Sequence, residues 1–360
     1  MIAASWQDDI GKLDYGIEEE QFIFNADGTP PPREQIIAVF EALAARGMTP
    51  KACDKTGELL AVKREMPGGL LVMKNDFCSH IFEIAFPPVR GVAEFTAIYH
   101  EATALAMEVL AGFGLRVRPG GALATMPEEI VLRASDSDNV RKRMDRYDDR
   151  PLPRRPFSHR YFFAGMCSVH CHLNVLDDAF YARLPAQYSV EYLVPLLYSE
   201  SPVFNGRRAH CTRPLMYRDG FCLAYRAAGI PDPIPTTPLA YRAFLAGSQG
   251  FIRDYSFIAP SWHGTVEFRA ACVQPTLDEL IEVLALRVAQ VIGVACGYWR
   301  ERPHLRALFW NACLTGTAPQ SVLDEDYAAL NLIWPLMPDD LREPLDRVLR
   351  RFEGWQQMAA

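Results

Sequence analysis

The chain has 360 residues, which is enough for one large domain or two ordinary ones with a sizeable core. Hydrophobic residues make up 49% of it and charged residues 22%, and the net charge of -7 argues against broad nucleic-acid binding. It has neither an apolar run of about 18 residues nor a signal pattern at its start. Nine scattered cysteines without a CxxC pair suit reduced thiols. We therefore expect a soluble cytoplasmic protein.

The first informative stretch is an apolar, β-rich run that contains three consecutive glutamates. Residues 15–24 predict a strand, followed by a turn at 25–28. Alternate side chains of a strand share a face, so Glu18 and Glu20 point together and Glu19 points away. Two neighbouring carboxylates on a covered sheet repel one another, and a hard divalent cation would neutralise them. The alternative is an acidic edge strand that faces water.

The second informative stretch carries a lone acid inside an apolar strand. A helix is predicted over residues 33–46, then strands over 59–62 and 70–73 with a turn between them. A further strand over 80–86 contains Glu83, and Asp76 lies seven residues earlier. The two carboxylates can converge if the chain bends between them. Otherwise Glu83 is an exposed residue on a half-buried strand.

Two histidines mark the third stretch. A helix over 95–113 and a strand over 115–124 precede a polar, irregular segment at 135–160, which we interpret as a functional connection rather than a domain linker. In the strand over 164–175, His170 and His172 share one face and suit a divalent metal or phosphate oxygens. Zinc bound with Cys167 and Cys171 is disfavoured, because the strand turns Cys171 to the other face.

Arginines and one more acid characterise the following region. After a predicted helix over 189–201, the segment to residue 226 holds five arginines, which form either a solvated basic loop or an anion-binding wall. In the fourth stretch, 262–270, Glu267 and Arg269 share a face, either as an ion pair or as an oxygen ligand and a phosphate contact. A capping box at 276–279 opens a helix over 280–299, and the rest is helical.

Together the four stretches place oxygen and nitrogen donors on one face of a sheet. Five carboxylates and an imidazole exceed the needs of one octahedral cation, so we expect two or three Mg²⁺ or Mn²⁺ ions. Magnesium in such numbers usually accompanies nucleotide phosphates, whose developing charge arginines can neutralise. The chain has no GxxxxGK[ST] loop and no kinase signature, so a different kind of nucleotide site is indicated.

The order of these motifs resembles that of the carboxylate–amine ligases of the glutamate–cysteine ligase type 2 family, in the glutamine synthetase superfamily. The motifs that carry the resemblance hold their order over about residues 12–316, and they are Gly-x-Glu-x-Glu at 16–20, Asp-Phe with a following Glu at 76–83, Gly-Met-x3-His-x-His at 165–172, Ser-Pro-x-Phe-x-Gly at 201–206 with Tyr-Arg at 217–218, and His-Gly-Thr-Val-Glu-Phe-Arg-x5-Pro-Thr-Leu-Asp-Glu at 263–279.

The resemblance implies a fold and a reaction. The fold would be α+β, a single catalytic domain over 1–360 in which a curved, mainly antiparallel sheet forms a funnel with helices on its outer face, and a helical part spans about 280–360. In the reaction, ATP would phosphorylate a small-molecule carboxylate, typically the γ-carboxylate of glutamate. An amine would then attack the acyl phosphate to give an amide, ADP and phosphate. Nucleic acid and membrane partners are not expected, and a homo-oligomer is compatible with the sequence.

The resemblance also assigns roles to individual residues. Arg269 would contact the ATP phosphates with His172 nearby, and Arg218 would face the substrate carboxylate or the transferred phosphoryl group, which makes both arginines candidate catalytic residues. The expected ligands of Mg²⁺ or Mn²⁺ are Glu18, Glu20, Asp76, Glu83, His170 and Glu267.

Three departures from the family pattern keep other functions open. Cys167 to Val169 separate Gly-Met from the histidine pair, as a bulge or a two-residue insertion, and Asn174 stands where a glycine is usual. Residues 312–315 lack the arginine that the family often has there. The alternatives are a metal-dependent hydrolase, in which the same cluster activates water, and a catalytically silent homologue that binds nucleotide or metal.

Overall fold

The computed structural model describes residues 13–52, 57–76, 78–125, 164–204, 206–222, 228–247, 255–261 and 264–359. The predicted connection at 135–160 lies outside these ranges, as do Phe77, Trp262 and His263. The free thiols of the described part are Cys78, Cys167, Cys171, Cys211, Cys272, Cys296 and Cys313. Among the described residues, every helix is too short or too polar to span a lipid bilayer.

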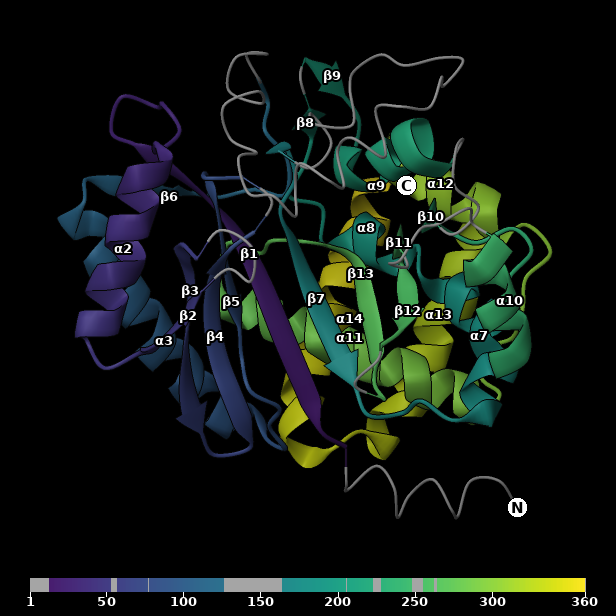
Figure 1. Ribbon diagram of the computed structural model, residues 1–360. Coiled ribbons are helices and arrows are strands. Elements are labelled where there is room, and N and C mark those ends of the chain that lie inside the picture. Colours follow the sequence, from purple (N-terminus) through teal and green to yellow (C-terminus); the bar gives the residue numbers. More distant parts are fainter. Residues whose placement is uncertain are drawn as a thin grey trace.

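A nine-stranded sheet forms the centre of the molecule, and all of its strand pairs are antiparallel (Figure 1). Its order is β12-β13-β7-β1-β5-β4-β3-β2, with β6 paired to β1. The strands are β1 Tyr15–Asn25, β2 Thr49–Ala52, β3 Leu59–Met66, β4 Gly69–Asn75, β5 Ile81–Ala85, β6 Leu115–Arg118, β7 Ser168–Leu173, β12 Ile258–Pro260 and β13 Val266–Cys272. Two small ribbons pair β8 Val203–Phe204 with β9 Arg207–Arg208 and β10 Ala228–Gly229 with β11 Tyr255–Ser256.

Helices cover the outer face of this curved sheet, as the family resemblance implies (Figure 1). On one half, α2 packs against β3 and α3 against β6; on the other, α11 packs against β7 and α14 lies along α11. The described helices are α2 Arg33–Ala45, α3 Val92–Gly112, α7 Asp178–Val190, α8 Leu193–Leu197, α9 Thr212–Met216, the π-helical η1 Tyr217–Cys222, α10 Pro238–Gly247, α11 Leu277–Ala295, α12 Leu305–Thr315, α13 Gln320–Ile333, the 3-10 turn η2 Trp334–Leu336 and α14 Asp339–Ala359.

The glutamate-bearing strand β1 lies in the middle of the sheet, not at an edge. It pairs with β5 on one side and with β7 and β6 on the other. Its apolar residues Ile17, Phe22 and Ile23 are buried in the core. Glu19 points to the helix-covered side, where burial raises its pKa to about 7 despite hydrogen bonds from Gln21 and Tyr99. The alternation predicted for Glu18 to Glu20 is therefore confirmed, and the alternative of a water-facing edge strand is wrong.

Two predicted elements differ from the structure. Of the helix expected over 189–201, only residues 189–190, at the end of α7, and Leu193–Leu197, which form α8, are helical. Pro195 lacks the N–H that would bond to the carbonyl of Glu191, and its ring disfavours a continuous helix. The strand expected over 115–124 ends at Arg118, before Pro119 and Gly120. Gly120 has a φ of +116°, which favours glycine, and only an isolated bridge from Ala122 to Met166 follows.

Candidate active site

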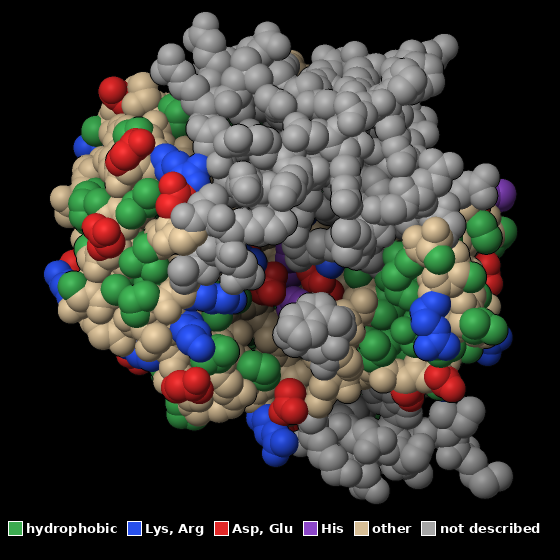
Figure 2. Space-filling model, in the orientation of Figure 1, with side chains coloured by type: hydrophobic (Ala, Val, Ile, Leu, Met, Phe, Trp, Pro, Cys, Tyr) green, Lys and Arg blue, Asp and Glu red, His purple; other side chains and the backbone are tan. Residues whose placement is uncertain are grey.

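The register of four neighbouring strands lines up the predicted site residues. Across β1 and β7, Glu18 is opposite His170. Across β7 and β13, His172 is opposite Glu267, and across β1 and β5, Glu20 is opposite Glu83. Figure 2 shows acidic and histidine side chains in a recess near the centre of the face drawn there. The predicted donors therefore converge on one face of the sheet.

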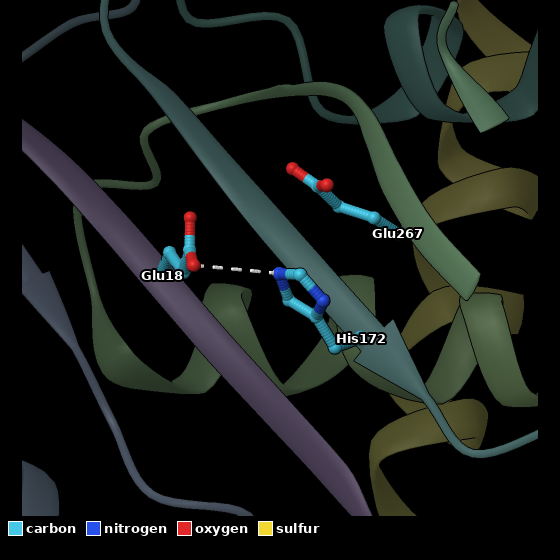
Figure 3. A group of neighbouring side chains, drawn as sticks. All are labelled: Glu18, His172 and Glu267. Carbon is cyan, nitrogen blue, oxygen red and sulfur yellow. Dashed lines mark ion pairs between the residues drawn. The ribbon is translucent and has the colours of Figure 1, made fainter. Parts of the chain in front are cut away.

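The first group of ligand atoms joins three strands and consists of Glu18, His172 and Glu267 (Figure 3). One donor atom from each lies within 4.8 Å of the other two. His172 Nε2 is 3.6 Å from Glu18 Oε1, whereas its Nδ1 lies 3.3 Å from the Thr265 hydroxyl. The Thr265 contact holds one ring nitrogen and turns the other toward the carboxylates, as second-shell partners of metal-bound histidines do.

The second group consists of Glu20, Asp76 and Glu83, whose donor oxygens also lie within 4.8 Å of one another. The bend before β5 brings Asp76 back to Glu83, as the sequence predicts. Burial raises the pKa of Glu83 to about 8 even though Lys74 opposes the shift, and repulsion by Glu18, Asp76 and Glu20 adds to it. Burial also raises the pKa of Glu20 against the influence of His170. In the free protein this group has more negative charge than its surroundings readily accommodate.

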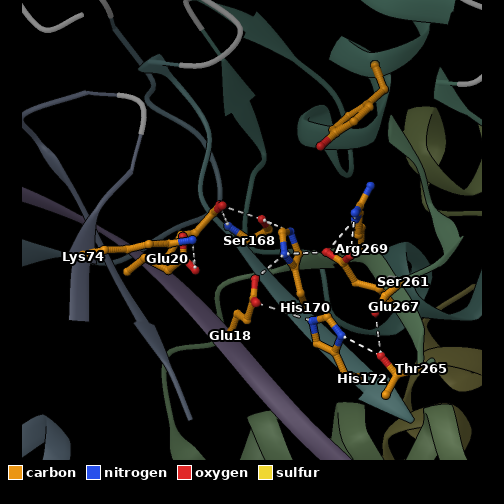
Figure 4. Close-up of polar contacts among 12 residues, drawn as sticks. Glu18, Glu20, Lys74, Ser168, His170, His172, Ser261, Thr265, Glu267 and Arg269 are labelled. Carbon is orange, nitrogen blue, oxygen red and sulfur yellow. Dashed lines mark hydrogen bonds and ion pairs between the residues drawn. The ribbon is translucent and has the colours of Figure 1, made fainter. Parts of the chain in front are cut away.

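His170 contacts two carboxylates of the first group and reaches Glu20 of the second group only through Ser168 (Figure 4). Its Nδ1 is 3.3 Å from Glu18 Oε2 and 3.1 Å from Glu267 Oε1, and its Nε2 is 2.9 Å from the Ser168 hydroxyl. Burial would lower the pKa of His170, but these carboxylates outweigh burial and raise it to about 9. In the same way His170 outweighs burial at Glu18 and brings that pKa down to about 2. A protonated His170 therefore holds the two ionised carboxylates together.

Arg269 sits where β13 loses its regular pairing. The register with β7 shifts between Phe268 and Ala271, so β13 has one extra residue there, and such bulges re-aim side chains. The irregularity lies in β13, whereas Val169 of β7 keeps a regular partner in β1. A bulge at Val169, before the histidine pair, is therefore wrong, and the two-residue insertion stays a prediction. Arg269 Nε and Nη2 donate to the two oxygens of Glu267 at 2.6 and 2.5 Å. Burial raises the pKa of Glu267, but Arg269 and His170 more than offset this and lower it.

Arg218 lies in η1 and contacts other partners. Its Nε donates to Asp219 at 2.6 Å, and its guanidinium lies 5.7 Å from the centre of the Trp310 ring in α12. Asp219 also pairs with Arg207. The described contacts of Arg218 are thus with Asp219 and with Trp310 of α12, and Asp219 links it to Arg207 of the predicted basic segment. The carboxylates of the two ligand groups contact Lys74, Ser168 and Arg269 instead.

Two polar residues of the site, Lys74 and Ser168, were not proposed from the sequence, and Arg213 was named only as one arginine of the basic segment up to residue 226. Lys74 Nζ lies 2.8 Å from Glu83 Oε1, the backbone N–H and hydroxyl of Ser168 donate to Glu20 Oε2 at 2.9 and 2.6 Å, and Arg213 Nη1 donates to the Arg269 carbonyl at 2.8 Å. Strand alternation gave a signal for Ser168, which lies two residues before His170. The place of Lys74 in the site follows only from the register of β4 with β5, which the sequence does not reveal. Arg213 lies on helix α9, so strand alternation gives no signal for it.

The donor set fits a hard divalent cation at both groups. Within the described part of the chain, buried His172 Nε2 and Glu83 Oε1 lack a hydrogen-bond partner, although each is near a charged neighbour. Buried polar atoms without partners are unfavourable unless a ligand satisfies them. Carboxylates with at most one imidazole are the ligands of Mg²⁺ and Mn²⁺, and the described cysteines take no part in either group. Zinc bound through cysteine is thereby disfavoured.

Fold and site together define the class of protein. The chain has a curved antiparallel sheet with helices on its outer face (Figure 1), and carboxylates and histidines gather on one face of that sheet. The model of glutamate–cysteine ligase family 2 matches residues 15–289. The chain belongs to this family, which supports an ATP-dependent carboxylate–amine ligase.

Comparison with solved structures shows the same fold. The glutamate–cysteine ligase of Francisella tularensis, solved in complex with AMP, has a TM-score of 0.66 and 12% sequence identity over 96% of this chain and 82% of that one. A bifunctional glutathione synthetase from Pasteurella multocida gives a TM-score of 0.64 and 12% identity over 98% of this chain, which spans only 48% of that enzyme. No protein with a curated description matches the chain by sequence.

Proposed function

We propose that the protein joins a small-molecule carboxylate to an amine in an ATP-dependent reaction through an acyl phosphate, releasing ADP and phosphate. Glutamate is the proposed acid, reacting at its γ-carboxylate to give a γ-glutamyl amide. The observation that carries the proposal is the pair of ligand groups, Glu18–His172–Glu267 and Glu20–Asp76–Glu83, side by side on the inner face of the family's sheet.

Each group would hold one Mg²⁺ or Mn²⁺. Bound there, the cations would neutralise the phosphate charge of ATP and orient its terminal phosphate. The family resemblance names His170 as a ligand and places His172 near the phosphates, whereas the free Nε2 of His172 favours that residue in the first group. His170, bonded on both ring nitrogens, would fix the positions of Glu18 and Glu267 and would become a ligand only after losing a proton.

The proposed roles of the arginines follow from their partners. The guanidinium of Arg269 is held in plane by Glu267, which leaves it preorganised to stabilise charge on a transferring phosphoryl group. Arg213 would fix the backbone at that bulge through the Arg269 carbonyl. Arg218, oriented by Asp219, is the proposed contact of the substrate carboxylate or the phosphoryl group. The Francisella enzyme was solved with AMP, which supports a nucleotide as the partner of such a site.

A screen of ADP release tests the proposal. Purified protein is incubated with MgATP and a panel of amino acids and amines, singly and in pairs. The proposal expects ADP release that requires an acid and an amine together and yields an amide. Release of hydrolysis products without an amine would support the hydrolase instead. Absence of turnover across the panel, together with measurable nucleotide binding, would support the silent homologue. Residues 312–315 in α12, which lack the arginine that the family often has there, are the feature that favours this alternative.

A further inference from the structure

One positive charge lies inside the second carboxylate group. Lys74 of β4 is opposite Glu83 of β5, and Glu83 is in turn opposite Glu20 of β1. Like charges directly opposite one another in a sheet are destabilising, so the Glu83–Glu20 pair needs a counter-charge. The Lys74 ammonium, 2.8 Å from Glu83 Oε1, is placed to supply it, and Figure 4 shows its side chain extending along the sheet toward Glu20.

The contact is close, but it leaves the carboxylate incompletely satisfied. Oε1 of Glu83 receives no hydrogen bond among the described residues, although the ammonium is within ion-pair distance. The side chain of Glu83 is 3% exposed, whereas that of Lys74 is 34% exposed. The carboxylate is thus fixed inside the site, while the lysine, on its flexible four-carbon stem, has a route to solvent.

Resting on the proposed function, we propose that Lys74 is a positioning residue that occupies the cation position of the Glu20–Asp76–Glu83 group and must leave Glu83 before a divalent cation can bind. The ammonium keeps three carboxylates together in the free protein and weakens their affinity for a bare metal ion. Removing its charge should therefore tighten metal binding, the opposite of what loss of a structural contact would do.

Metal binding measures this competition directly. Free Mn²⁺ is followed by its paramagnetic resonance signal while it is titrated into chelator-treated protein at fixed ionic strength, without nucleotide. Two neutral variants, Lys74→Met and Lys74→Gln, are used so that a folding defect in one leaves the other. Each should bind Mn²⁺ about tenfold more tightly than the wild type, ~1.4 kcal/mol. The metal-free variants should unfold at a lower temperature than the wild type.

Two controls separate the local charge from other effects. Lys51 is exposed on β2, the far edge strand, so Lys51→Met removes the same charge from the same sheet and should change Mn²⁺ affinity by less than about twofold. Lys74→Arg keeps the charge and should not tighten binding. In Lys74→Met, an added Glu83→Gln change should abolish the gain, because the tightened site contains Glu83.

The outcomes distinguish this inference from the function on which it rests. Wild-type binding of Mn²⁺ with unchanged or weaker binding in the neutral variants would overturn the role of Lys74 and leave the metal site standing. Failure of wild type and neutral variants alike to bind Mn²⁺ would overturn both. If Lys51→Met increased the Mn²⁺ affinity as much as the Lys74 variants do, the effect would be one of net charge, and this too would overturn the role of Lys74.

Discussion

Glu83 is the residue in which burial and charge conflict most. It is 2% exposed, faces Glu20 across the strand pair and has a pKa raised to about 8. If it is a metal ligand, Glu83→Gln should reduce turnover by about a hundredfold. The matched control is Glu65→Gln, an exposed acid on β3. Near-normal ADP formation by Glu83→Gln would show that this acid is only structural.

Arg269 offers a test of whether the cluster serves phosphoryl transfer. Its fork is held by Glu267, and lysine would keep the charge but lose the fork. We predict that Arg269→Lys lowers kcat more than it raises KM for ATP, because the contact strengthens in the transition state. A rise in KM for the acid alone would indicate substrate binding. A lower melting temperature with normal kinetics would leave only a structural ion pair.

His80 makes stability depend on pH. It is fully buried, stacks on Phe22 and Phe24, and its Nε2 lies 2.6 Å from the Ala164 carbonyl. Burial lowers its pKa from 6.5 to about 4, although the hydrogen bond to Ala164 opposes this shift. Because the folded protein disfavours the protonated form, the contribution of His80 is fully present above pH 6.5 and is lost as the pH falls toward 4, by about 3 kcal/mol.

The variant His80→Phe isolates that contribution. At neutral pH it should be less stable than the wild type, because the Ala164 carbonyl loses its partner. The difference in the free energy of unfolding should shrink or reverse as the pH is lowered toward 4, since phenylalanine does not titrate. A constant difference across this range, measured by urea unfolding, would contradict the assignment to His80.

At the scale of elements, a capping residue in the sequence indicates where a helix starts. Thr276 caps α11 as predicted: its hydroxyl oxygen accepts from the Glu279 N–H at 3.2 Å, and the hydroxyl donates to the Glu279 carboxylate at 3.0 Å. The start of α7 depends in the same way on Asp177, which accepts from the Phe180 N–H, a signal we overlooked. The break before α8 required attention to Pro195.

The cap of α11 gives a stability prediction. Thr276→Ala should lower the free energy of unfolding by about 1 kcal/mol, because one N–H at the start of the helix loses its acceptor. Thr103 lies inside α3 and caps no helix start, so Thr103→Ala should change stability by less than about 0.5 kcal/mol. Equal effects of the two substitutions in denaturant unfolding would contradict the capping role.

At the scale of the whole molecule, the sequence predicted which side chains share a face of a strand, but not which residues of other elements they contact. Strand alternation alone placed Glu18 with Glu20 and His170 with His172, because a strand turns every second side chain the same way. It could not determine that β4 brings Lys74 to Glu83, that β13 bulges at Arg269, or that α9 brings Arg213 to the Arg269 carbonyl. Those contacts depend on strand order and register, which link residues far apart in the chain.

The balance of charge across the site predicts how the protein responds to metal removal. Lys74, His170 and Arg269 neutralise part of the acidic cluster from within, and the apolar core lies on the other face of the sheet. Chelation should therefore abolish ATP turnover while the protein keeps a cooperative thermal transition, and added Mg²⁺ or Mn²⁺ should restore activity. Full activity in metal-free protein would contradict the metal site, and the melting curve would reveal any unfolding.

The central claim is that a carboxylate takes the phosphoryl group of ATP before an amine replaces it. The most direct measurement uses the acid that the ADP screen selects, labelled with heavy oxygen in its reacting carboxylate, and follows the label by mass spectrometry. An acyl phosphate requires that one labelled oxygen leave with the released phosphate while the amide keeps the other. Labelled phosphate should appear in proportion to ADP and amide. Phosphate free of label, with amide and ADP still formed, would contradict it.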